Sequence, residues 1–158
     1  MLVELFLQDL GATFVSDPST GYDFIAAFPN DKGGMNFSAI EVKATDRPIG
    51  HFYPLDKKWY TRLAHSNVPA LLLVVDAKHN RLYHAWPGEG DVRKLNSDAR
   101  TVRIAVAPID DAVKDQIRDR LVGADNLDFN SRGRRSRLDA SHMADNKSRR
   151  HSIANVGI

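Results

Sequence analysis

The sequence predicts an α/β domain in which helices flank a central mixed sheet. Three observations support this prediction. Helical spacing of apolar residues alternates with strand-like apolar runs along the first 123 residues. The run 68–75 is almost continuously apolar, which is typical of a strand covered on both faces. Two strand-like runs, at 23–28 and 37–45, are joined by a segment rich in turn-forming residues, which suits a hairpin.

The first predicted elements are a helix and a short strand. Residues 2–10 place Leu2, Phe6 and Leu10 four positions apart, so these side chains share one helical face. Residues 13–15 then predict a short strand, which ends before a Pro- and Gly-containing turn.

The hairpin forms the next part of the predicted sheet. Its strands cover residues 23–28 and 37–45, and the connection at 29–34 ends in two glycines. After it, residues 54–66 predict a helix, because Leu55 and Leu63 lie at helical spacing with Trp59, which we assign to the core.

The last predicted elements complete the sheet and cover it. Residues 69–77 predict the strand buried on both faces, and residues 82–86 and 101–107 predict two further strands. Residues 110–122 predict a closing helix with its apolar positions four apart.

The length and composition fit one folded domain followed by a tail. The chain has 158 residues, of which 42% are apolar and 27% charged. Apolar periodicity stops near residue 123, so we assign the domain to residues 1–123. Residues 124–158 are rich in Ser, Asn, Asp and Arg, and we expect this basic tail to be disordered because it has little apolar surface to bury. No apolar run is long enough for a membrane-spanning helix.

The positive charge belongs to the tail. Seven Lys and Arg and four Asp lie in residues 124–158, whereas the first 123 residues carry 15 basic and 16 acidic residues. A basic surface over the whole domain is therefore not predicted. The tail could contact nucleic acid electrostatically, or it could simply be a solvated charged segment.

Several chemistries are excluded by missing residues. The chain has no cysteine, which excludes disulfides and thiolate sites and suits a reducing compartment, so we expect a cytoplasmic protein. The six histidines lack zinc-site spacing. Neither a nucleotide-binding glycine loop nor a serine-hydrolase elbow is present.

Three charged residues predict a site on the hairpin. Glu41 and Lys43 lie two apart on a strand, so their side chains share one face at a separation of roughly 7 Å. Asp23 opens the paired strand, and its carboxylate can reach the same place. Two carboxylates and a lysine suit Mg²⁺-assisted phosphodiester cleavage, because Mg²⁺ takes oxygen ligands and a lysine can stabilise charge in the transition state.

These residues resemble the pattern of a known superfamily. Gly21-Tyr-Asp23-Phe, followed by Ile40-Glu-Val-Lys43-Ala-Thr45 and the buried strand, is similar to the PD-(D/E)XK nucleases, which have a restriction-endonuclease-like fold. More narrowly, the pattern resembles an uncharacterised bacterial branch, a domain of unknown function found in defence or mobile-element contexts. The resemblance covers about residues 2–87 and implies an αβββαβ core.

The resemblance implies a role for each matching residue. Asp23 and Glu41 would be ligands of Mg²⁺ or Mn²⁺, together with the main-chain carbonyl of Val42, and Lys43 would be the catalytic lysine. Glu4 on the first helix is the candidate for a further acidic ligand. The implied activity is that of a metal-dependent endonuclease, with DNA favoured over RNA as the substrate.

The sequence departs from the superfamily pattern at two places. Tyr22 stands where the superfamily has a proline, and the second helix lacks a glutamine found in some branches.

Four basic residues are candidates for binding nucleic-acid phosphates: Arg47, Lys57, Lys58 and Arg62. Sequence specificity could come from a homodimer or from a partner protein. The plainer interpretation is that these four residues form the ordinary polar face of a helix and its neighbouring loop.

Two other functions fit the same residues. The chain could be a nuclease-like fold that binds DNA or a protein without cutting. It could also be a small interaction protein in which Glu41 and Lys43 merely form a same-face charge pair. The intact Asp, Glu and Lys set favours an active nuclease.

Overall fold

The computed structural model describes residues 2–88, 92–94 and 99–123, and the predicted tail at 124–158 lies outside the described residues. The chain has an α/β fold with a mixed sheet, which confirms the predicted class. The helices are α1 (Leu2–Asp9), η1 (Pro18–Thr20, a 3₁₀ turn), α2 (Lys57–Ala64) and α3 (Asp111–Gly123). The strands are β1 (Thr13–Val15), β2 (Phe24–Pro29), β3 (Met35–Thr45), β4 (Phe52–Asp56), β5 (Ala70–Asp76), β6 (Arg81–Ala85), β7 (Val92–Lys94), β8 (Thr101–Ala105) and β9 (Ala107–Pro108). Within these ranges no helix is long and apolar enough to cross a membrane.

The larger sheet has the strand order β1-β2-β3-β5-β6-β9. Strands β3 and β5 are parallel, and the chain passes from one to the other through β4 and α2. The other neighbouring strands of this sheet pair antiparallel. Strand β3 is 11 residues long and has a partner on each side, so its middle is fixed along both edges.

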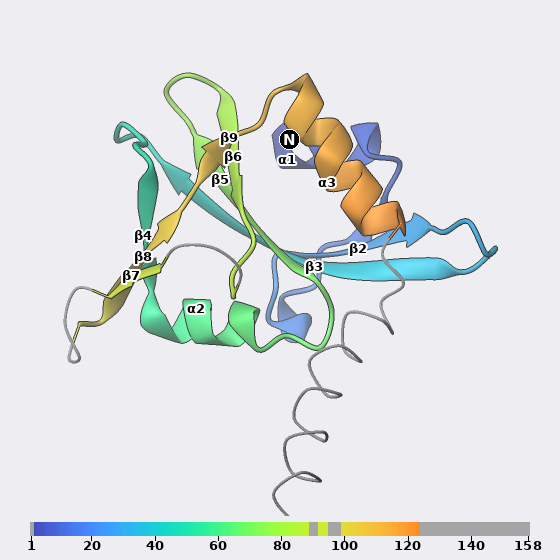
Figure 1. The fold of residues 1–158 in the computed structure, drawn as a ribbon, viewed down its shortest axis with the longest axis horizontal. Coiled ribbons are helices and arrows are strands. Elements are labelled where there is room, and N and C mark those ends of the chain that lie inside the picture. The colour runs from blue at the N-terminus through green and yellow to red at the C-terminus, as the bar shows by residue number, and fades with distance from the viewer. Residues whose placement is uncertain (1, 89–91, 95–98, 124–158) are drawn as a thin grey trace, which may run out of the picture. The chain divides into compact units, whose positions relative to one another are not determined.

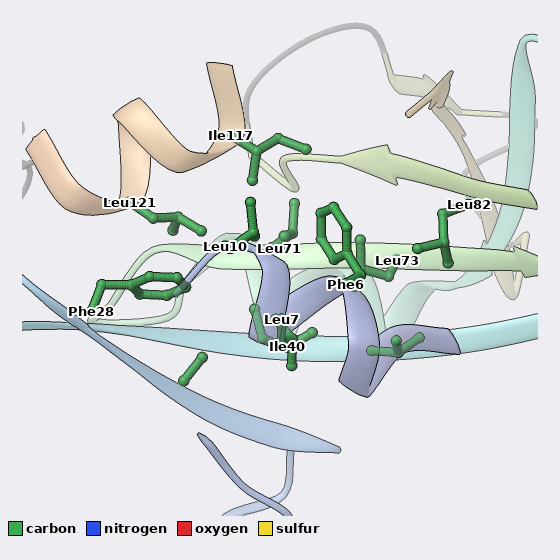
Figure 2. Packing of buried hydrophobic residues seen from close by; sticks show 12 residues of the cluster. Phe6, Leu7, Leu10, Phe28, Ile40, Leu71, Leu73, Leu82, Ile117 and Leu121 are labelled. Carbon is green, nitrogen blue, oxygen red and sulfur yellow. The ribbon is translucent and has the colours of Figure 1, made fainter. Parts of the chain in front are cut away.

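Helices α1 and α3 cover one face of the larger sheet, and α2 lies on the other side of β3 (Figure 1). On the first face, Phe6 and Leu7 of α1 and Ile117 of α3 pack against Ile40 and Leu71 in one buried apolar cluster (Figure 2). This packing removes apolar surface from water, which is the main driving force for folding.

The second face is covered by α2 and by a smaller sheet of order β4-β8-β7. Leu63 of α2, Leu55 of β4 and Ile104 of β8 belong to a second buried cluster with Leu72 and Val74 of β5. Because Leu71 and Leu73 face the first cluster, β5 is buried on both faces, as the continuous apolar run predicts.

The predicted helix over 54–66 is wrong in its first turn. Strand β4 continues to Asp56 and pairs antiparallel with β8, and α2 begins at the following residue. The Asp56 carboxylate accepts a hydrogen bond of 2.8 Å from the backbone N–H of Lys58, which caps the helix at its true start. Leu55 of β4 packs in the same cluster as Leu63 of α2, so an apolar spacing that is typical of a helix includes a strand residue here.

Two further elements differ from the predictions. The single strand predicted over 101–107 is divided, because β8 joins the smaller sheet while β9 pairs with β6 in the larger one. Between them, the Val106 N–H donates to the carbonyl of His51 at 3.0 Å. Strand β7 has no counterpart in the predicted elements. The predicted hairpin is confirmed as β2 and β3.

A buried asparagine holds the end of α3 against β3. Asn36 is 4% exposed, and its Nδ2 donates to the carbonyls of Leu121 at 3.1 Å and Val122 at 3.0 Å. Its Oδ1 accepts from Nδ2 of Asn30 at 3.1 Å. The last carbonyls of a helix have no partner within the helix, so this amide satisfies groups that would otherwise be buried and unpaired.

We expect Asn36→Asp to destabilise the protein by about 1–3 kcal/mol, because a carboxylate cannot donate and would face the carbonyl end of α3. Chemical denaturation measures the loss. Gln116→Glu makes the same change at an exposed position of α3 and is the matched control. Equal stability of Asn36→Asp and the wild type would show that the amide does not hold the helix.

Candidate functional site

Strand β3 presents Glu41 and Lys43 on the face that α2 covers. Their partners on β5 are Leu72 and Val74, which belong to the cluster on that face. Ile40, which directly precedes Glu41, belongs to the buried cluster on the other face of the sheet. The alternation predicted from the sequence therefore places one carboxylate and one ammonium side by side above the middle of the sheet.

Glu41 is a buried carboxylate, with 1% of the residue exposed. Its Oε1 pairs with the Lys43 ammonium. Its Oε2 is also buried, and it has no hydrogen-bond partner among the described residues. Burial raises the pKa of Glu41 above its ordinary value of 4.5, and this effect outweighs the attraction of Lys43.

Two other charges act on Glu41. The Asp23 carboxylate raises the pKa of Glu41 further, and the Arg62 guanidinium lowers it. Asp23 therefore lies close enough to Glu41 for their charges to interact, as the hairpin predicts. A second carboxylate beside a buried one favours either protonation or a bound cation.

The β2–β3 pairing explains the position of Asp23. Phe24, the first residue of β2, pairs with Ile40, so the preceding residue lies beside the part of β3 that carries the site. The exposed Asp23 accepts a hydrogen bond of 2.7 Å at its Oδ2 from the backbone N–H of Val42. This bond fixes the carboxylate at the residue between Glu41 and Lys43.

Helix α2 supplies an aromatic ring over the lysine. The Lys43 ammonium lies 4.5 Å from the centre of the Trp59 ring, a cation–π contact. The Lys43 side chain keeps 28% of its surface exposed. The ammonium is therefore held between the Glu41 carboxylate and Trp59, and part of the side chain still faces solvent.

Arg62 is fixed beside the same ring. Its guanidinium lies 5.3 Å from the Trp59 ring and 5.1 Å from the Tyr22 ring. Gly21 makes this position possible, because an added Cβ there would lie 1.5 Å from Nη2 of Arg62. Gly21 also has a φ of +76°, which other residues rarely adopt.

The other predicted site residues are exposed and take no part in the site contacts described above. Lys57 and Lys58 are exposed in the first turn of α2, and Arg47 is exposed in the loop after β3. Glu4 is exposed on α1, and the buried residues of that helix pack on the face opposite Glu41. Its role as a metal ligand stays a prediction.

The structure adds contacts that sequence reasoning missed. The stacking of Arg62 on two aromatic rings depends on the fold, although Gly21 before Tyr22 is a local signal for a close approach. Trp59 packs against the second cluster, as expected for a core residue, but it also contacts the Lys43 ammonium.

Asp23 and Glu41 are the residues here that are able to hold a metal. In the described part of the chain, no group of three or more His, Asp or Glu side chains forms a ready cation site. One or two carboxylates are enough for Mg²⁺, which keeps several of its waters. The Oε2 of Glu41, which is buried and has no hydrogen-bond partner in the described ranges, suits a ligand of such an ion.

Comparison of the chain with protein-family models and with curated proteins gives no match. The function is therefore inferred from the chemistry of these side chains.

In metal-free protein, the stability of Glu41→Gln relative to wild type should be higher at neutral than at acidic pH. Folding raises the pKa of Glu41, so the stabilising contribution of its protonated form is present below 4.5 and is lost as pH rises through the raised pKa. Glutamine resembles the protonated acid at every pH. The melting temperature of the variant relative to wild type should therefore rise between about pH 4 and about pH 7.

Thermal unfolding in EDTA measures this difference. Glu4→Gln, the same change at an exposed site, is the control for the loss of one carboxylate. If the difference in melting temperature between Glu41→Gln and wild type stays constant with pH, burial does not raise the pKa of Glu41.

Proposed function

We propose that this chain is a metal-dependent nuclease that hydrolyses phosphodiester bonds in DNA, with Mg²⁺ or Mn²⁺ as its ion. Asp23, Glu41 and Lys43 form the proposed site. The observation that carries the proposal is the buried Oε2 of Glu41, which has no described partner although Asp23 and Lys43 lie beside it.

The order of the elements supports a restriction-endonuclease-like core. Helix α1, strands β1 to β3, helix α2 and strand β5 follow the order αβββαβ, with β4 inserted before α2. The first three strands form an antiparallel meander, and β5 runs parallel to β3. The proposed site lies on the third strand of this core.

The donor set fits a hard divalent cation. Mg²⁺ prefers oxygen ligands and accepts one or two carboxylates. Asp23 and Glu41 would supply these, and the main-chain carbonyl of Val42 would add a third oxygen. When bound, the ion would lower the pKa of a coordinated water and polarise the scissile phosphate.

Lys43 would stabilise charge that develops during hydrolysis. Water adds to phosphorus, the bond from phosphorus to the leaving sugar oxygen breaks, and the leaving oxygen takes a proton. Negative charge grows on the phosphoryl oxygens in the transition state. The Lys43 ammonium is already held by Glu41 and Trp59, so it needs little reorganisation as that charge forms.

Arg62 would act as a positioning residue. It stacks on the same ring as Lys43 and lowers the pKa of Glu41, which favours the ionised carboxylate that a cation needs. Its contacts with Trp59 and Tyr22 connect α2 to the residue that precedes Asp23.

We expect Lys43→Ala to lower the rate of DNA cleavage roughly a hundredfold or more while leaving metal and DNA binding nearly unchanged. The ammonium acts on charge that is present only in the transition state. Lys43→Arg should recover little activity, because a planar guanidinium cannot take the place of a compact ammonium.

Plasmid cleavage in Mg²⁺ or Mn²⁺ measures the rate, and a melting curve checks the fold. Lys78→Ala removes an exposed lysine from the turn after β5 and is the matched control. Cleavage by Lys43→Ala at the wild-type rate would overturn the assignment. Wild-type protein that binds metal and DNA but never cuts would instead support a binding module.

A further inference from the structure

We propose that the hollow between the end of β3 and strands β4 and β8 binds the DNA strand next to the scissile bond, with Arg47 and Arg103 contacting its phosphates. That the bound strand lies next to a scissile bond rests on the proposed function. The binding itself does not require cleavage.

The hollow adjoins the candidate site. It has a volume of about 470 Å³, within the range of small-ligand sites, and its wall begins at Ala44, the residue after Lys43. Thr45 also lines it, about 7 Å beyond Lys43 along the strand. Tyr53 of β4 and Arg103 of β8 form other parts of the wall. A nucleotide next to the cleaved phosphate would therefore reach this surface.

The charge of the hollow suits a polyanion. Among the residues that the structure describes, Arg47 and Arg103 line it, and no Asp or Glu does. A second hollow, of about 510 Å³, lies where α1 and α3 meet the β6 edge. Its described lining has three carboxylates, of Asp9, Asp110 and Asp111, against two cations, Arg81 and Lys114. Carboxylates would repel a phosphate backbone there, so charge selects the hollow beside β3.

Both arginines are available to a ligand. Within residues 2–88, 92–94 and 99–123, neither guanidinium has a hydrogen bond or an ion pair, whereas Arg118 pairs with Asp115 at 3.0 Å. The guanidinium of Arg103 stacks on the Phe52 ring at 5.6 Å. Stacking uses the face of the guanidinium and not its in-plane N–H donors, which are the donors that bind phosphate.

The loop that carries Arg47 has a defined start. The backbone N–H of Arg47 donates to Oγ1 of Thr45 at 3.0 Å, which forms a local turn directly after β3. Arg47 is thereby tied to the strand that carries Lys43, while Arg103 approaches from the smaller sheet. The hollow therefore receives one arginine from the loop after β3 and one from β8.

The test measures binding of a short fluorescein-labelled DNA duplex to the full chain by anisotropy in EDTA, over a range of salt concentrations. We expect Arg47→Ala and Arg103→Ala each to weaken binding roughly threefold to tenfold at low salt. Each should also reduce the slope of log K against log salt by about one. Arg81→Ala, an exposed arginine of β6 that lines the acidic hollow, is the matched control and should bind as wild type does.

The inference is overturned if both variants bind DNA as tightly as wild type does, or if wild type binds no DNA. It is also overturned if Arg81→Ala loses as much DNA affinity as Arg47→Ala and Arg103→Ala do. Cleavage in Mg²⁺ or Mn²⁺ is measured separately. Arginine-dependent binding without any cleavage would refute the proposed nuclease and leave the binding surface standing. Cleavage by wild type, with unchanged binding by both variants, would refute the binding surface alone.

Discussion

A carboxylate buried in the middle of the central strand is the constraint on which the site depends. Glu41 is 1% exposed, and ionised groups are costly to remove from water unless they are paired. Lys43 pairs with one carboxylate oxygen, and Arg62 adds a second positive charge nearby. The other oxygen has no partner in the described residues, and the Asp23 carboxylate adds to the negative charge. A divalent cation would give the second carboxylate oxygen of Glu41 a partner and would draw the two carboxylates together.

The fold converges three segments on this carboxylate. The hairpin brings Asp23 to the backbone of Val42, and the strand itself places Lys43 on the same face. Helix α2 then brings Trp59 over the ammonium. The parallel pairing of β3 with β5 requires a crossover, and that crossover contains the helix that covers the site. The same crossover contains β4, which forms one wall of the hollow beside the site.

Much of the site could be predicted because its geometry is local. The two-residue period of a strand places Glu41 and Lys43 together, and a glycine-ended loop predicts the hairpin that adds Asp23. Strand β4 was missed because its identity depends on pairing with β8, which lies more than forty residues later in the chain. The position of Arg103 beside β4 depends on the same long-range pairing, so the sequence does not predict it either. No local pattern reveals which cations remain unpaired, since this depends on neighbours that only the folded chain brings close.

If Asp23 and Glu41 together bind a divalent cation, Mn²⁺ titration followed by electron paramagnetic resonance will detect the bound ion. We predict that wild-type protein binds about one Mn²⁺ per chain through these two carboxylates. Asp23→Asn and Glu41→Gln should each weaken binding by at least roughly tenfold, by analogy with the losses seen when metal-site partners are removed. Asp31→Asn, in the exposed hairpin loop, should bind as wild type does. Wild-type protein that binds no Mn²⁺, or variants of Asp23 and Glu41 that bind it equally well, would contradict the account.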